Sequence, residues 1–174
     1  MKFHHEIEFL HLAQQIARNS KDPSRKIGAI AVSNDSRRLI LSTGWNGFPR
    51  SIEDTYDRLH TRETKYKYTI HAEMNMIFNA CYNGVSLADS HVFVYGLPVC
   101  SKCALALIQV GIGSVISQVN EEIHEPWLSE WKFSSELFSE ANIPHLLWNS
   151  YYEEVITESH DSQLDSFRRS TCSC

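Results

Sequence analysis

The sequence predicts an α/β protein: a three-layer α/β/α sandwich around a central five-stranded mixed sheet. Short β-branched segments alternate with stretches of helical periodicity, which is typical of a sheet covered by helices on both faces. The chain has 174 residues, of which 43% are hydrophobic and 21% charged, as in a globular domain with a sizeable core. We expect one domain over residues 1–156, followed by a polar, weakly ordered tail over 157–174.

The first third of the chain predicts a helix over residues 5–19, a β-hairpin over 26–33 and 38–43, and a loop over 44–50. The helix is indicated by apolar side chains at helical spacing, such as Leu10 and Ala13. The two strands are apolar runs joined by a polar turn at Asn34 and Asp35. Gly and Pro content indicates the loop. The polar residues 51–69 that follow give no assignment.

The rest of the chain alternates helices with strands. Helices are expected over residues 69–84, 101–110 and 126–141, strands over 91–95, 114–119 and 144–148, and a further helix over 151–156. Ala72, Met76 and Ala80 form the apolar face of the first of these helices, and Gly84 ends it. Pro126 suits the first turn of its helix, because the first N–H groups of a helix have no intrahelical partner.

Composition and charge narrow the classes of function. The formal net charge is −5, which weighs against polynucleotide binding, because that activity usually needs a basic face. A small anionic ligand could bind among the basic residues of the first half, which are Lys21, Arg25, Lys26, Arg50, Arg58, Arg62, Lys65 and Lys67. No apolar run approaches a membrane span, and the N-terminal residues lack an apolar signal region, so we expect a cytoplasmic protein without a membrane partner.

Four residues carry the chemistry that the sequence predicts. They stand in the motifs His71-Ala72-Glu73 and Pro98-Val99-Cys100-Ser101-Lys102-Cys103. Imidazole and thiolates bind zinc, and a zinc ion with three protein ligands keeps a fourth position for water. A carboxylic acid beside it can move the protons of that water. We therefore expect a catalytic zinc site with His71, Cys100 and Cys103 as ligands and Glu73 as the proton carrier; this order of motifs is the signature of zinc deaminases of nucleobases.

Other interpretations of the same residues stay open at this point. A Cys-x-x-Cys pair can be a redox disulfide. A structural zinc site would need a fourth protein ligand, which His91 or Cys81 could supply. A zinc-stabilised interaction protein without catalysis is a further alternative, but it would have no use for an acid at Glu73. Both motifs fall at the starts of expected helices, where backbone N–H groups favour thiolates.

The chain resembles the deoxycytidylate (dCMP) deaminases of the cytidine deaminase-like superfamily over about residues 5–147. Besides the zinc motifs, the resemblance rests on Ser20-Lys21-Asp22-Pro23-Ser24, Ile27-Gly28-Ala29, Gly44-Trp45-Asn46-Gly47-Phe48-Pro49-Arg50, Lys65-Tyr66-Lys67-Tyr68 and the segment from Cys103 to Ile112. It implies the cytidine deaminase-like fold and hydrolytic deamination of dCMP to dUMP, which supplies thymidylate synthesis. The chain departs from the family pattern at Val99, which separates Pro98 from Cys100, and at Trp45, where Tyr is common.

The resemblance also implies roles for single residues. His71, Cys100 and Cys103 would hold zinc, and Glu73 would be the proton shuttle. The backbone around Ala72 would face the pyrimidine carbonyl, Asn46 would bond the sugar hydroxyl, and Ser24 or Lys26 would meet the phosphate. A regulatory triphosphate, dCTP as activator or dTTP as inhibitor, would bind with Mg²⁺ at a site formed by Gly44, Trp45, Asn46, Gly47 and Arg50. The protein would be a homo-oligomer, usually a hexamer.

Deaminases of other amine-bearing substrates are the main rivals. Enzymes that act on CMP, dCTP, tRNA adenosine or cytosine in single-stranded DNA share the zinc site. The negative net charge disfavours the two nucleic-acid substrates. Free cytidine deaminases usually carry Cys in place of His71. The sequence therefore favours a small nucleotide as substrate.

Overall fold

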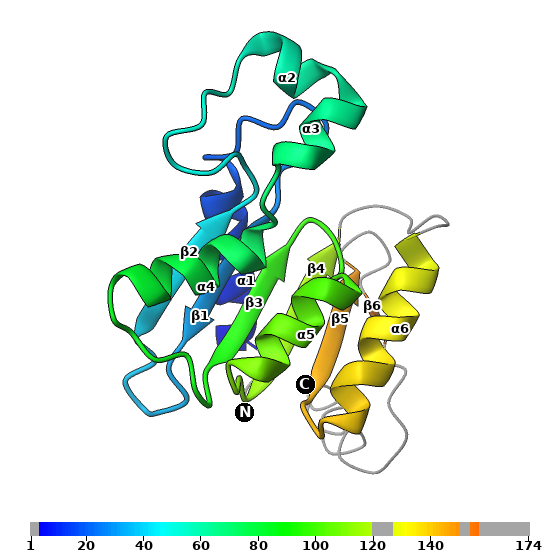
Figure 1. Cartoon of the computed structure of the whole chain (residues 1–174). Helices are drawn as coiled ribbons and strands as arrows, with labels where there is room; N and C mark the ends of the chain where they lie inside the picture. The colour runs from blue at the N-terminus through cyan, green and yellow to red at the C-terminus, as the bar shows by residue number, and fades with distance from the viewer. Residues whose placement is uncertain (1–3, 120–126, 150–153, 157–174) are drawn as a thin grey trace.

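A six-stranded mixed sheet forms the centre of the computed structural model, which describes residues 4–119, 127–149 and 154–156 (Figure 1). Its strands are β1 (Gly28–Val32), β2 (Ile40–Trp45), β3 (His91–Tyr95), β4 (Ser114–Val119), β5 (His145–Asn149) and β6 (Glu154–Ile156). They lie in the order β2-β1-β3-β4-β5-β6. Strands β3, β4 and β5 run parallel, whereas the other neighbours pair antiparallel.

Helices cover both faces of this sheet. On one face lie α4 (Ala72–Tyr82), α5 (Ser101–Gln109) and α6 (Trp127–Glu140), and α1 (His4–Ala17) packs on the other (Figure 1). Two short helices, α2 (Tyr56–His60) and α3 (Arg62–Tyr68), stand beyond one end of the sheet. This arrangement confirms the three-layer α/β/α class. None of the helices in the described part of the chain has the length and apolar content needed to cross a membrane.

Strand β1 shows how the sheet divides the core into two halves. Ala29 and Ala31 face α4 and pack in one cluster with Met76, while Ile30 and Val32 pack with α1 in another. Side chains alternate between the two faces of a strand, so the five consecutive buried residues of β1 pack against the helices on both faces of the sheet. The continuous apolar run of β1 therefore reflects its position inside the sheet, covered on both sides.

Gly44 sets the distance between β2 and α4. A Cβ atom at this position would lie 2.3 Å from the backbone N of Met76 and 2.4 Å from the backbone O of Ala72. Backbone atoms of a packed helix have no room to yield, so only glycine permits this approach. The start of α4, which carries the His71-Ala72-Glu73 motif, is therefore held against the edge strand of the sheet.

All five expected strands are present, as are the expected helices over residues 5–19, 69–84, 101–110 and 126–141, with ends shifted by up to three residues. Helices α2 and α3 lie in the segment that gave no assignment. The expected helix over 151–156 is wrong for Glu154–Ile156, which pair antiparallel with β5 as a sixth strand. Two of these three residues are β-branched and favour a strand. Residues 151–153 and the tail over 157–174 lie outside the described residues.

Candidate active site

Two neighbouring helix starts bring the two metal motifs together. His71 immediately precedes α4 and Cys100 immediately precedes α5, both with extended backbone, and Cys103 lies in the first turn of α5. Helix α4 packs over β1 and β2, and α5 lies beside it on the same face of the sheet (Figure 1). The N–H groups of a first helical turn point out of the helix and stabilise negative charge. This position favours the thiolate form of the cysteines.

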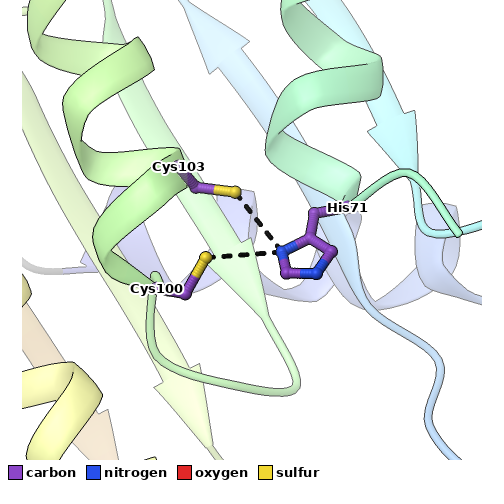
Figure 2. A group of neighbouring side chains, drawn as sticks. All are labelled: His71, Cys100 and Cys103. Carbon is purple, nitrogen blue, oxygen red and sulfur yellow. Dashed lines mark hydrogen bonds between the residues drawn. The ribbon is translucent and has the colours of Figure 1, made fainter. Parts of the chain in front are cut away.

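The three expected zinc ligands converge on one point, as Figure 2 shows. Nδ1 of His71 lies 3.4 Å from Sγ of Cys100 and 3.4 Å from Sγ of Cys103. Ordinary Zn–N and Zn–S lengths at a tetrahedral ion place such atoms about 3.5 Å apart, so the donor set fits zinc. Among the described residues this group includes neither His91 nor Cys81. His91 instead bonds to Asn34 and Ser114.

The protons of the three ligands are strongly coupled. A hydrogen bond from the Cys103 thiol lowers the pKa of Cys100 to about 4. A hydrogen bond with Cys100 raises the pKa of His71 to about 9. The hydrogen bond of the Cys103 thiol to Cys100, together with burial, raises the pKa of Cys103 above its ordinary value. One thiolate is therefore formed before any cation binds. A metal ion would displace the remaining protons, so its affinity should increase with pH.

Glu73 is buried beside these ligands. Its side chain is 4% exposed, and burial raises its pKa above the ordinary value for a glutamate. Residues that are two positions apart on a helix do not share a face. Glu73 and His71 nevertheless line the same pocket, because they stand at the very start of α4. Leu97 and Pro98 form an apolar part of its wall. A carboxylic acid in such surroundings can both accept and donate a proton near neutral pH.

The other end of this pocket is polar. Of the expected substrate-binding residues, Asn46, Ala72 and Ser24 line the pocket, whereas Lys26 is exposed and lies outside the lining. Asp22, Arg25, Lys65 and Tyr66 also line it. The sequence placed Arg25 and Lys65 among the basic residues that could bind a small anion, but it gave none of the four residues a role in this site. Asp22 had a local signal, since an Asp that precedes Pro and Ser favours a side-chain-capped turn. No local sequence signal indicated that Lys65 would be buried.

The five residues expected to bind a regulatory nucleotide do not all lie at the same site. Trp45, Gly47 and Arg50 line a separate pocket next to α4. Arg50 bonds to Asn79 and lies over the ring of Tyr82, 5.3 Å from its centroid. The other two residues of that prediction lie elsewhere: Gly44 is covered by α4, and Asn46 belongs to the pocket that contains Glu73.

The sequence matches the family described as the cytidine and deoxycytidylate deaminase zinc-binding region over residues 4–119. The chain belongs to this family. The matched span contains both metal motifs and every residue that lines the pocket with Glu73. The resemblance inferred from the motifs is therefore confirmed.

Relatives of known name extend the similarity over most of the chain. Deoxycytidylate deaminase of Mus musculus is 31% identical over 86% of this chain and 83% of its own length. A probable deoxycytidylate deaminase of Caenorhabditis elegans is 32% identical over 85% of this chain and 68% of its own. The dCMP deaminase from the cyanophage S-TIM5, solved in complex with dCMP and dUMP, matches with a TM-score of 0.65 and 21% identity, covering 84% of this chain and 98% of its own. This last similarity shows the shared fold.

Proposed function

We propose that the protein is a zinc-dependent deaminase that hydrolyses dCMP to dUMP and ammonia, and so supplies dUMP for thymidylate synthesis. The observation that carries the proposal is the convergence of three zinc-ligand side chains with a buried glutamate at one pocket. The names of the relatives from Mus musculus and Caenorhabditis elegans support dCMP as the substrate.

His71, Cys100 and Cys103 would hold the zinc through Nδ1 and the two sulfur atoms. When bound, zinc lowers the pKa of a water molecule toward about 7 and supplies a nucleophile at neutral pH. The start of α5, where both cysteines lie, would stabilise the two thiolates that hold the ion. Among the described residues the group holds three side chains, which would leave one tetrahedral position for that water.

Glu73 would carry the protons of the reaction. It takes one proton from the attacking water and delivers it to the ring nitrogen next to the reacting carbon. The oxygen forms a bond to that carbon, and the amino group leaves as ammonia after Glu73 passes on the second proton of the water. The burial of Glu73, which raises its pKa, suits a group that must accept and donate in turn.

The polar end of the pocket would bind the sugar and the phosphate, while the backbone at Ala72 faces the pyrimidine carbonyl. Oδ1 of Asn46 accepts one hydrogen bond, from the Ile27 N–H at 2.8 Å, and keeps a second lone pair for a sugar hydroxyl. Ser24 and Arg25 are assigned to the phosphate, because they line the pocket. The assignment of Lys26 is replaced by that of Arg25, since Lys26 lies outside the lining.

Several further expectations remain predictions. A regulatory dCTP or dTTP with Mg²⁺ would be found at Trp45, Gly47 and Arg50, which share a pocket. The protein would assemble as a homo-oligomer, a hexamer by family resemblance, and would be cytoplasmic. Sedimentation velocity with and without dCTP, dTTP and Mg²⁺ tests the assembly and the effectors together.

The proposed function is tested by the rate of ammonia release from dCMP, CMP, dCTP, deoxycytidine and a tRNA anticodon stem-loop. We expect dCMP to give a kcat/KM at least tenfold above each of the others. A different preferred substrate would overturn the choice of dCMP and leave the zinc chemistry in place. Zinc-loaded protein that releases no ammonia from any of the five would contradict the proposed function as a whole.

A further inference from the structure

A buried ion pair forms part of the wall at the polar end of the pocket. Nζ of Lys65 lies 2.8 Å from Oδ1 of Asp22, and the two side chains are only 5% and 10% exposed. The same Nζ donates to the hydroxyl of Ser24, also at 2.8 Å. Lys65 comes from α3 and Asp22 from the loop after α1, 43 residues earlier. Because desolvation offsets much of the attraction in a buried pair, stability alone is a weak reason for its presence.

Asp22 is the central acceptor of this wall. Besides Lys65, its Oδ1 accepts the backbone N–H groups of Ser24 at 2.7 Å and Arg25 at 3.2 Å. Its Oδ2 lies 3.4 Å from Nδ2 of Asn46, which donates to it. The Asp22 carboxylate therefore fixes the turn that carries Ser24 and Arg25, which are proposed to bind the phosphate. It also contacts Asn46, which is proposed to bind the sugar.

The side chain of Asn46 is held in one orientation by these bonds. Its Nδ2 group donates to Asp22 and to the backbone O of Arg25 at 2.9 Å, and its Oδ1 accepts from the N–H of Ile27. Both amide hydrogens are in use, so the atom left with capacity for a ligand is Oδ1, as an acceptor. Any movement of Asp22 would disturb this orientation.

The charge of Asp22 creates a specific problem for a nucleotide. A carboxylate in the wall repels a phosphate that approaches the same end of the pocket, and burial in protein strengthens the repulsion relative to water. Lys65 neutralises this charge at a distance of 2.8 Å. Arg25 also lines this pocket, so a second cationic side chain is available to the phosphate.

We propose that Lys65 is a positioning and specificity-determining residue: by neutralising Asp22 and fixing its carboxylate, it allows the pocket to accept the anionic phosphate of a nucleoside monophosphate. This inference rests on the proposed function, because it takes the pocket to be the binding site of dCMP. It assigns Lys65 no contact with the reacting atoms. We expect Lys65 to affect how much the phosphate group contributes to the affinity of the nucleotide.

The contribution of the phosphate is measured as the dissociation constant of deoxyuridine divided by that of dUMP, both determined by calorimetry on the zinc-loaded protein. Lys65→Met should lower the ratio at least tenfold, because an unpaired Asp22 then faces the phosphate. Asp22→Asn should raise it, because Lys65 keeps its charge. The double variant Asp22→Asn/Lys65→Met should return the ratio to within about threefold of wild type, and Lys65→Arg should preserve it.

A purely structural role for Lys65 would weaken both ligands equally and leave the ratio unchanged in every variant; this result would overturn the inference. If Lys65→Met does not fold, Asp22→Asn and the double variant still test the charge role of Lys65. A ratio that fails to rise in Asp22→Asn contradicts that role. Failure of the proposed function is a separate outcome. It would be seen as absence of dCMP turnover in the wild type, which the binding ratios do not measure.

Discussion

Ser101, between the two cysteines of the metal motif, bonds twice to the carboxylate of Glu130. Its backbone N–H lies 3.3 Å and its hydroxyl 2.9 Å from Oε2 of that residue. Glu130 belongs to α6, so this contact ties α6 to the first turn of α5, where Cys103 lies. The orientation of the cysteine ligands thus depends on a helix that supplies no ligand itself.

Replacement of Glu130 by Ala should therefore weaken zinc binding. Groups that orient metal ligands typically contribute 10–100-fold to metal affinity, and we expect a loss of about tenfold here. Competition with a chromophoric chelator measures it. Glu136→Gln, which alters an exposed carboxylate on the same helix, is the matched control and should leave the affinity unchanged. Equal affinities for Glu130→Ala and Glu136→Gln would contradict this role.

Arg25 and Lys26 offer a direct test of where the phosphate binds. Arg25 lines the pocket and its neighbour Lys26 does not. Arg25→Gln should raise the KM for dCMP about tenfold, with a smaller change in kcat, because a charge-assisted bond to the substrate is lost in the ground state. Lys26→Gln should leave both constants near the wild-type values. Steady-state kinetics that show the reverse pattern would restore Lys26 as the phosphate contact.

Gly44→Ala should destabilise the fold and disturb the metal site together. The added methyl group would meet two backbone atoms of α4 at 2.3 and 2.4 Å, and overpacking of this kind costs about 1–3 kcal/mol. Urea unfolding and zinc titration measure the two effects. At Gly47 the nearest atom to an added Cβ is a side-chain atom of Trp45 at 3.9 Å, so Gly47→Ala should be nearly neutral. The two variants should differ clearly in unfolding free energy.

His145 should make the protein less stable in mild acid. Burial lowers the pKa of His145 to about 4 from an ordinary value of 6.5, and its Nε2 has no hydrogen-bond partner among the described residues. Between pH 6.5 and 4 the unfolded chain binds a proton that the folded chain does not, so unfolding becomes easier as pH falls. The linked free energy is about 3 kcal/mol at its limit.

The variant His145→Gln removes this titration. Its free energy of unfolding, measured by urea denaturation at a series of pH values, should depend less on pH between 6.5 and 4 than that of the wild type. Above pH 7 the two curves should run parallel. Identical pH dependence across the acidic range would show that His145 does not carry the effect.

The metal ligands could be predicted from sequence because residue type and spacing suffice for them. His71, Cys100 and Cys103 are chemically distinctive, and each motif falls where a strong helical pattern begins. The polar end of the pocket could not be predicted in the same way. Lys65 stands in a polar segment without clear periodicity, and its burial depends on Asp22, which is 43 residues away in the chain. Such a pairing is visible only once the fold brings α3 to the loop after α1.

The sixth strand shows a similar limit. Glu154–Ile156 is too short for its periodicity to separate a strand from a helix. What decides the outcome is the open edge of β5, whose backbone groups pair with those of the added strand. Pairing with β5 therefore sets the conformation of this segment, in agreement with the strand preference of its two β-branched residues.

Glu73 is the residue on which the proposed chemistry most directly depends, and its replacement by Gln is the decisive measurement. Zinc content and ammonia release from dCMP should be measured on the same preparation of Glu73→Gln and of the wild type. We expect an unchanged zinc content with a kcat lower by about 10²–10⁴-fold, because the amide cannot accept and return the protons of the reaction. Turnover close to that of the wild type in the zinc-loaded variant would contradict the account.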